Sequence, residues 1–227
     1  MKTIVITGGK RAGKSHILLS VARVLSNAGF QVLAVDTTKD ADILSFFNIN
    51  RTIEGGFSMN SFPVITREGF DIMAPGLRFD FKLLEGEMED RDFILFEVDR
   101  VLSFPPDMPS QILMVQDMDI ENLHTLEKLT TQFIKSYPNV PTTIVINNYI
   151  RCKLSLNFTY HLLDALPDQL FIIPMDLSNT TNALNSRVDG RLRLNGFTQE
   201  HNQAVFSLAC KISGIENNRK NFKKLIR

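Results

Sequence analysis

The chain has 227 residues, 44% hydrophobic and 22% charged, which is the composition of an ordinary globular protein that buries a sizeable core. Its 25 basic and 25 acidic residues cancel, so overall charge favours neither nucleic acid nor a membrane surface as a partner. The sequence contains no apolar stretch near the roughly 18 residues of a membrane span and no signal-peptide pattern. Its two cysteines, Cys152 and Cys210, are far apart and are expected to be free thiols. We therefore expect a cytoplasmic protein.

The first elements in chain order form a strand–helix–strand unit. Lys2–Thr7 is a β-branched apolar run that ends in glycines, which predicts a buried strand. His16–Ala28 carries apolar residues at helical spacing and is followed by Gly29, a helix-ending residue. Gln31–Val35 predicts a second strand. A strand, a helix and a strand in this order indicate parallel strands joined by a right-handed crossover.

The rest of the chain continues the alternation. The sequence predicts further strands at Val64–Thr66, Asp71–Met73, Phe93–Phe96, Ile112–Val115, Thr143–Ile146 and Leu170–Ile173. It predicts further helices at Ile120–Ser136, Leu156–Leu166 and Gln199–Ser213. We therefore expect an α/β fold, a doubly wound and mostly parallel sheet with helices on both faces, formed by one domain over 1–216 and followed by a tail over 217–227.

A phosphate-binding loop lies between the first strand and the first helix. Residues 8–15 match the pattern G-x-x-x-x-G-K-[ST] in full. Glycines let successive N–H groups point inward at a phosphate, and the helix adds its positive N-terminal dipole. Lys14 would reach the β- and γ-phosphates, and the Ser15 hydroxyl would bind Mg²⁺. The pattern predicts ATP or GTP binding by Gly8, Gly9, Lys10, Arg11, Ala12, Gly13, Lys14 and Ser15.

With this loop, the chain resembles the MinD/ParA family of dimerising P-loop ATPases. Later segments keep the family's order, with 92–97 in the place of its Walker B strand. The other segments that carry the resemblance are 31–36, 68–76, 112–133, 143–148 and 171–176. The resemblance implies ATP and Mg²⁺ as ligands, a nucleotide-dependent homodimer and a role in positioning a cargo.

The resemblance also implies roles for individual residues. Lys14, Asp36 and Lys10 would serve catalysis, and Ser15, Asp36 and Glu97 would lie on the metal side. Asn147 would read the adenine base. Its neighbours at the nucleotide would be Pro174, Asp176 and His16, although packing in the first helical turn is a simpler interpretation of His16. Asp36 could instead cap a turn, and Asn147 and Asn148 could be turn residues.

Three positions depart from the family pattern. Gly9 stands where the family has a second lysine that reaches the partner's nucleotide, and Lys10 follows one place late. Thr38 replaces a second aspartate, and Glu97 replaces the Walker B aspartate. Because the last two changes touch the metal and water side, we hypothesise a protein that binds nucleotide and hydrolyses it slowly or not at all.

The tail carries basic residues beside three apolar ones. Phe222, Leu225 and Ile226 fall at i, i+3 and i+4, as on one face of a helix. Such a helix could lie on an anionic membrane, as the resemblance also suggests, whereas a solvated and frayed terminus is the alternative. DNA binding, if it occurs, would require the dimer and weaken steeply with salt.

The function expected from these features is a switch that positions a plasmid or chromosome locus, or a secretion, pilus or polysaccharide assembly. A metabolic ligase of the same fold, similar to dethiobiotin synthetase, is an alternative from another class. A catalytically inactive nucleotide-binding scaffold is a third. The sequence contains no motif for a ligase's substrate pocket.

Overall fold

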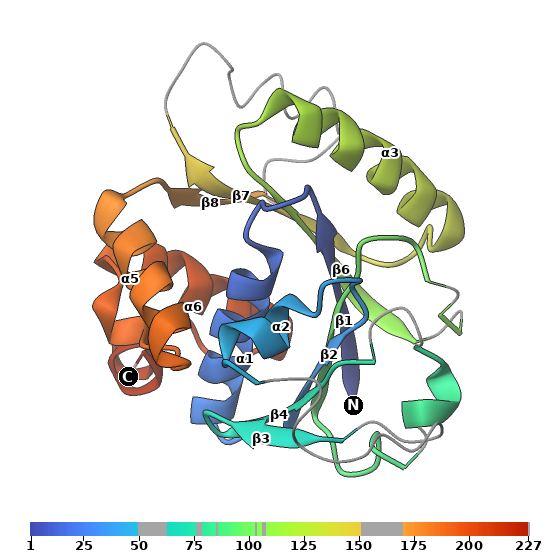
Figure 1. The fold of residues 1–227 in the computed structure, drawn as a ribbon, viewed down its shortest axis with the longest axis horizontal. Helices are drawn as coiled ribbons and strands as arrows, with labels where there is room; N and C mark the ends of the chain where they lie inside the picture. The colour runs from blue at the N-terminus through green and yellow to red at the C-terminus, as the bar shows by residue number, and fades with distance from the viewer. Residues whose placement is uncertain are drawn as a thin grey trace.

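The computed structural model describes residues 1–49, 63–75, 79–84, 86–102, 104–105, 108–150 and 170–226. Its centre is an eight-stranded sheet in the order β3-β4-β2-β5-β1-β6-β7-β8 (Figure 1). The strands are β1 (Lys2–Gly8), β2 (Val32–Asp36), β3 (Ile65–Arg67), β4 (Phe70–Met73), β5 (Phe93–Glu97), β6 (Pro109–Gln116), β7 (Thr142–Tyr149) and β8 (Leu170–Pro174).

The strands run parallel, except that β3 pairs antiparallel with β4 at one edge. β1 lies between β5 and β6, and its Ile4, Val5 and Ile6 are at most 1% exposed. A strand buried on both faces needs apolar residues at consecutive positions, which is why β1 reads as a continuous apolar run. The carboxyl ends of the parallel strands meet at one edge of the sheet, where such folds bind their ligands.

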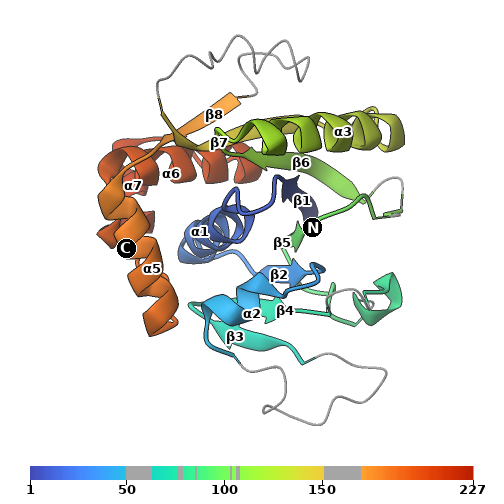
Figure 2. The ribbon, with the colours of Figure 1, turned by 45° about the horizontal axis from the view of Figure 1, so that its top comes forward.

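Helices cover both faces of the sheet (Figure 2). Ile17 and Leu18 of α1 (Lys14–Asn27) pack in one core cluster, together with residues of α6 (Gln199–Ser213) and α7 (Arg219–Leu225). Leu126 and Phe133 of α3 (Ile120–Ser136) pack in the other cluster. The predicted doubly wound arrangement is confirmed. The remaining helical segments are α2 (Asp42–Phe46), α5 (Leu177–Asp189) and the short 3-10 turns Phe81–Leu84 and Leu194–Gly196.

The predicted strands and three of the predicted helices are present within a few residues of their expected ends. The helix expected at Leu156–Leu166 lies outside the described residues. Helices α2 and α5 were not predicted. α5 is rich in Asn, Ser and Thr, and its buried residues are the polar Asn179 and Ser186. Its amphipathic pattern is therefore reversed relative to that of a core-facing helix.

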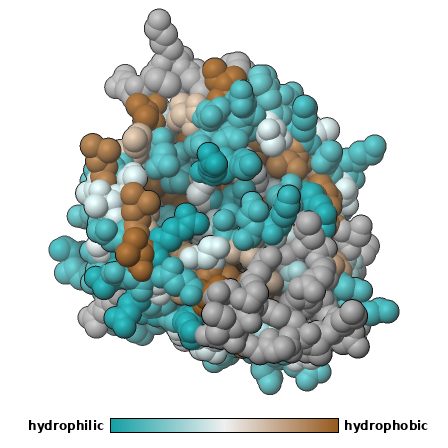
Figure 3. Space-filling model, in the orientation of Figure 1, coloured by the Kyte–Doolittle hydropathy of each residue, from teal (hydrophilic) through white to brown (hydrophobic). Residues whose placement is uncertain are grey.

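The outward side of α5 carries large apolar residues. Leu177, Leu184 and Val188 are 77%, 59% and 78% exposed. Figure 3 shows apolar patches on the left of the face it draws, the side on which α5 lies in Figure 1. Among the described helices, none combines the length and the apolar character needed to cross a bilayer.

The tail forms a helix that packs onto the domain. Leu225 of α7 is 3% exposed, and Asn27 Nδ2 of α1 donates a hydrogen bond to its carbonyl oxygen at 2.8 Å. The Phe222 ring contacts the Phe206 ring edge-on, with centroids 5.5 Å apart, and Ile226 packs against the same core. The expected amphipathic helix is present, but its apolar face points inward. In this structure the segment is therefore a docked helix rather than a frayed end, with Leu225 buried and Phe222 and Ile226 half-buried. Its association with a membrane stays a prediction.

Candidate nucleotide site

The loop of residues 8–15 leaves β1 at the centre of the sheet's carboxyl edge. Gly8 has φ +142°, and a Cβ there would lie 1.8 Å from the Val115 carbonyl oxygen. That oxygen instead accepts a hydrogen bond from the Gly9 N–H at 3.1 Å. A side chain at position 8 would therefore displace the loop from β6, which explains the need for glycine.

The end of the loop is the start of α1, and its geometry suits an anion. Gly13 is the N-cap residue and has no side chain to bond the free N–H groups of the first turn, which also lacks an acidic residue. Such unbonded N–H groups and the helix dipole favour a phosphate. Lys14 Nζ donates to the Gly9 carbonyl oxygen at 2.9 Å, so the lysine already lies back along the loop.

Two asparagines from neighbouring elements hold the loop from outside. Asn122 Nδ2 of α3 donates to the Lys10 carbonyl oxygen at 2.9 Å, and Asn147 Nδ2 of β7 donates to the Ala12 carbonyl oxygen at 3.0 Å. These bonds engage two loop carbonyls, while the Gly9 and Ala12 N–H groups donate to the Val115 and Gly9 carbonyl oxygens at 3.1 and 3.3 Å. Asn147 was predicted to read the base; in this structure its amide nitrogen donates to the loop backbone, and the base contact stays a prediction.

Asn122 also accounts for a departure from the family pattern. A Cβ at Gly9 would lie 2.7 Å from Asn122 Cγ. The family's lysine at position 9 is therefore incompatible with this placement of Asn122. Sequence reasoning missed Asn122, whose signal was its place in the first turn of the helix after β6. Lys10 and Arg11 are exposed at the outer side of the loop, and Arg11 has φ +60°.

The metal-side residues meet at the other side of the loop. Ser15 Oγ donates to Glu97 Oε1 at 2.9 Å. Glu97 is 1% exposed, and its Oε2 is buried without a hydrogen-bond partner among the described residues. Burial, and secondarily the nearby Asp36 carboxylate, raise the pKa of Glu97 to about 8, against the lowering effect of the Ser15 hydrogen bond and of Lys14. A cation beside Glu97, in addition to Lys14, would stabilise the ionised carboxylate and lower this pKa.

Asp36 lies beside Glu97 in the adjoining strand, but both of its oxygens are occupied. Oδ1 accepts from Thr38 N–H at 2.9 Å and from Thr38 Oγ1 at 2.6 Å, and Oδ2 accepts from Ile43 N–H at 3.0 Å. Burial nevertheless raises the pKa of Asp36. These bonds hold the turn that leads from β2 into α2, which is the turn-capping alternative considered for Asp36. Thr38, in the place of the family's second aspartate, is part of that cap.

The residues present fit a magnesium ion through Ser15 and Glu97. A hydroxyl and a carboxylate are ligands that Mg²⁺ accepts. Glu97 Oε2 is buried without a hydrogen-bond partner among the described residues, so a cation could bind it. The described residues contain no cluster of three or more His, Cys, Asp or Glu that could hold a metal alone. A magnesium ion here would therefore depend on nucleotide phosphates and water for its remaining ligands.

His16 belongs to a contact between helices. Its Nε2 lies 3.2 Å from Nε2 of His201 in α6, so one ring nitrogen donates and the other accepts. Phe197 stacks on His201 with ring centroids 4.6 Å apart and contacts His16 at 4.9 Å. Burial lowers the pKa of His201 to about 4 and, with the adjacent His201, that of His16 to about 3. His16 thus joins α1 to α6, in agreement with its packing interpretation.

The two remaining predicted residues lie where β8 ends. Pro174 is the last residue of β8, and Asp176 is the N-cap of α5. The Asp176 carboxylate accepts from the Ser178 N–H at 2.7 Å and from the Ser178 hydroxyl, and these bonds lower its pKa. Both residues are at the carboxyl edge of the sheet, but Asp176 already has a structural role there.

Known proteins resemble this chain in structure but not detectably in sequence. No protein-family profile matches the chain, and no curated protein sequence matches it. The chain is similar in structure to MinD in a MinC:MinD cell division protein complex of Aquifex aeolicus, with TM-score 0.72, 16% identity, and 95% of this chain and 97% of that chain covered. MinD of Pyrococcus horikoshii complexed with Mg-ADP matches with TM-score 0.68, 16% identity, and coverages of 96% and 99%.

Two further solved structures come from other members of this group. A plasmid partition protein of Borrelia burgdorferi bound to AMPPNP matches with TM-score 0.70, 17% identity, and coverages of 94% and 99%. A variant of Cyanothece McdA in complex with ATP matches with TM-score 0.71, 12% identity, and coverages of 95% and 97%. These likenesses span nearly the full length of each chain. They confirm that this chain has the MinD/ParA P-loop NTPase fold.

Proposed function

We propose that the chain is a divergent MinD/ParA-like ATPase that binds Mg·ATP at residues 8–15 and acts as a nucleotide-dependent switch. The observation that carries this proposal is the loop itself, whose Lys10 and Ala12 carbonyls are bonded from outside and whose helix N-terminus is uncapped. The loop N–H groups would hold the β-phosphate, and Lys14 would leave the Gly9 carbonyl to reach the β- and γ-phosphates.

Hydrolysis is proposed to be slow. Magnesium would bind Ser15 and Glu97 and would neutralise charge on the phosphates, but only after the present Ser15–Glu97 hydrogen bond opens. Asp36 is committed to Thr38 and Ile43, so it is poorly placed to orient an attacking water. The same observation supports the alternative of an inactive scaffold, whose nucleotide would be a fixed ligand.

The switch is proposed to be a homodimer with nucleotide bound, in which Lys10 replaces the missing lysine at position 9. Its cargo would be a plasmid or chromosome locus or an envelope assembly. Support comes from the structural neighbours, which include a plasmid partition protein and MinD in complex with MinC. The exposed basic residues of α7 are the part of the tail that could meet DNA or an anionic membrane, since Leu225 is buried and Phe222 and Ile226 pack half-buried against the core.

Light scattering tests the proposal. The mass would be measured without nucleotide and with Mg·ATP, for the natural chain and for Lys14→Ala, while phosphate release is followed in parallel. A dimer that forms with Mg·ATP, releases little phosphate and is absent in Lys14→Ala would support the switch. A protein that binds ATP but remains monomeric would exclude it, and a substrate search for a metabolic ligase would replace it.

A further inference from the structure

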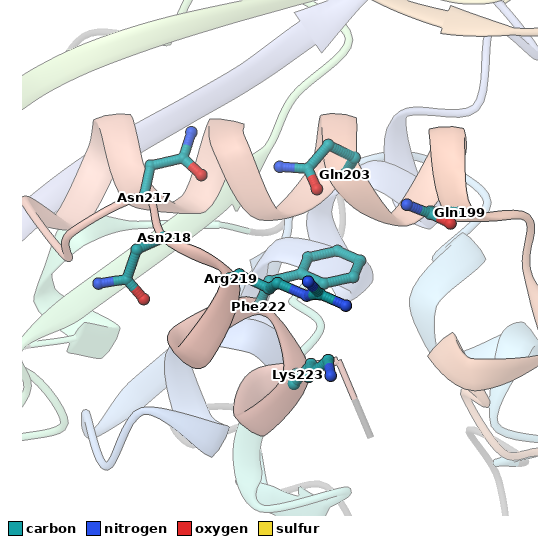
Figure 4. A pocket seen from close by; sticks show the side chains of 7 residues that line it. All are labelled: Gln199, Gln203, Asn217, Asn218, Arg219, Phe222 and Lys223. Atoms are coloured by element: carbon teal, nitrogen blue, oxygen red, sulfur yellow. The ribbon is translucent and has the colours of Figure 1, made fainter.

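A groove separate from the phosphate loop lies between α6 and α7. Its volume is about 410 Å³, within the range of small-molecule sites. Figure 4 shows its side chains facing the space between the two helices, with Gln199 and Gln203 from α6 and Arg219 and Lys223 from α7. The complete lining is Gln199, Gln203, Asn217, Asn218, Arg219, Phe222 and Lys223.

The lining divides into groups that build the groove and groups that are free. Asn217 Nδ2 donates to Ser207 Oγ at 3.1 Å, and Asn218 Oδ1 accepts from the Asn221 N–H at 2.9 Å. Phe222 packs on Phe206. These contacts fix the turn between the helices and the angle of α7 against α6. The walls are thus set by the fold, which lowers the conformational cost of binding.

Four other polar side chains have no hydrogen bond or ion pair to a described residue. They are the cations Arg219 and Lys223 and the amides Gln199 and Gln203. Arg219 and Lys223 are four residues apart on a helix, so both reach the same side. The acidic residues nearest in sequence, Glu200 and Glu216, do not line the groove. Glu216 Oε2 accepts a hydrogen bond from the lining residue Asn218 at 2.8 Å, so a carboxylate is next to the groove but forms no ion pair with either cation. Two such cations beside two free amides are a suitable environment for an anion that also carries hydroxyl groups.

We propose that this groove binds a small phosphorylated polyol, such as a sugar phosphate. Arg219 and Lys223 would donate charge-assisted hydrogen bonds to the phosphate. Gln199 and Gln203 would both donate to and accept from hydroxyl groups, because an amide carries an NH₂ donor and a carbonyl acceptor. Both helices pack on α1, the helix that starts in the phosphate loop, so occupancy of the groove bears on the element that positions Lys14 and Ser15.

The test uses calorimetric titration of glucose 6-phosphate, inorganic phosphate and glucose. All variants carry Lys14→Ala, which weakens the competing phosphate loop. Arg219→Ala/Lys223→Ala removes the two cations of the groove. Lys220→Ala/Lys224→Ala is the matched control, because it removes the same charge from exposed positions of the same helix that do not line the groove. Circular dichroism establishes that each variant is folded.

We expect glucose 6-phosphate to bind the Lys14→Ala parent and the control variant with equal affinity, and the groove variant about tenfold more weakly. Glucose should bind none of the three proteins. Gln199→Ala/Gln203→Ala should weaken glucose 6-phosphate binding but leave inorganic phosphate binding unchanged. Equal losses in both charge variants would overturn the proposal, since they would indicate a merely basic helix. The absence of binding to the parent would overturn it as well.

Discussion

Asn122 and Asn147 show how side chains outside the phosphate loop determine its shape. Each donates one hydrogen bond to a loop carbonyl, at Lys10 and at Ala12. The Ala12 bond is buried, and a buried carbonyl that loses its partner costs about 1–3 kcal/mol, whereas the Lys10 bond is exposed. The loop conformation is thus a property of the folded chain rather than of a bound ligand. It follows that Asn147 acts on every ligand held by the loop, whether or not the ligand contains a base.

Asn147→Ala should therefore weaken ADP and pyrophosphate binding by the same factor, about tenfold. Calorimetric titration of the two ligands measures this, and Asn148→Gly serves as the control, because Asn148 is the next residue, is exposed and has φ +55°, which glycine tolerates. A loss confined to ADP, with pyrophosphate unaffected, would instead establish the base contact expected from sequence.

Glu97 is one methylene longer than the aspartate of the family pattern, and its extra length brings Oε1 to the Ser15 hydroxyl. Glu97→Asp should remove this contact and make room for the metal and its water. We expect phosphate release from Mg·ATP to increase by about tenfold, because reacting groups tolerate little misplacement. Glu97→Gln, which keeps the length but cannot ionise to bind a metal, should not increase it. Release that is unchanged in Glu97→Asp would show that the residue at 97 does not limit hydrolysis.

For single residues, the sequence predicted the candidate loop but not the contacts that hold it. The pattern of residues 8–15 is local, so the backbone that it requires is local as well. Asn122, in contrast, is separated from the loop by most of the first half of the chain, and only the β1–β6 pairing brings the two together. The Asp36 bonds are local, but the one from the Ile43 N–H depends on helix α2, which the sequence did not predict.

Between elements, the His16–His201 contact joins the start of α1 to the first turn of α6. Both imidazoles are neutral in the folded chain because burial lowers the pKa of each, from 6.5 to about 4 in His201. Between these two values the unfolded chain binds a proton that the folded chain does not. Stability conferred by the neutral pair is therefore fully present above pH 6.5 and is lost as the pH decreases toward 4.

His201→Gln should flatten this dependence, because glutamine does not titrate. The free energy of unfolding of the natural chain should decrease between pH 6.5 and 4 by on the order of 3 kcal/mol more than that of the variant. Urea denaturation at several pH values gives this difference. His124→Gln, at an exposed position, should retain the natural slope. If His201→Gln shows the natural slope too, the acid sensitivity lies elsewhere.

The docking of α7 can be measured in the same way. Leu225→Ala removes a side chain that is 3% exposed, so it should reduce the free energy of unfolding by about 2–5 kcal/mol. The exposed neighbour Lys224→Ala should change it by less than about 0.5 kcal/mol. A Leu225→Ala protein as stable as the natural chain would mean that the tail is undocked in solution and that its apolar face is available after all.

The elements differ in how far sequence could predict them. The buried strands and α1, α3 and α6 have patterns dictated by burial in the core. In α7 the same i, i+3, i+4 pattern was correctly read as one apolar face, but a pattern does not specify whether the face meets a membrane or the protein itself. α5 buries Asn179 and Ser186 while Leu184 is exposed, so its burial contradicts hydrophobic periodicity.

For the molecule as a whole, the site and the fold are thermodynamically linked. A ligand that binds only the folded chain stabilises it by about 2.7 kcal/mol when present at a hundred times its dissociation constant. We expect Mg·ADP to increase the unfolding free energy by this amount in the natural chain and by little in Lys14→Ala at the same concentration. Chemical denaturation with and without Mg·ADP provides the measurement, and an equal gain in both proteins would place the nucleotide outside the loop.

The sequence predicted the class of the sheet but not the order of its strands. Alternating strands and helices specify a doubly wound sheet, which is present, and they predict that ligands bind at the carboxyl ends of its strands. The antiparallel β3 at the edge depends on a short turn around Gly69, and three residues carry too little pattern to fix a direction. The position of the loop at the sheet centre follows from β1 lying between β5 and β6.

The phosphate half and the metal half of the candidate nucleotide site differ in how far they are preformed, and this difference has a kinetic consequence. The phosphate half is already shaped by Asn122 and Asn147, whereas the metal half is closed by the Ser15–Glu97 hydrogen bond. Metal-free nucleotide should therefore associate in a single fast phase whose rate increases linearly with concentration. With magnesium, a second phase that does not depend on nucleotide concentration should follow, as the hydroxyl and the carboxylate separate to admit the ion.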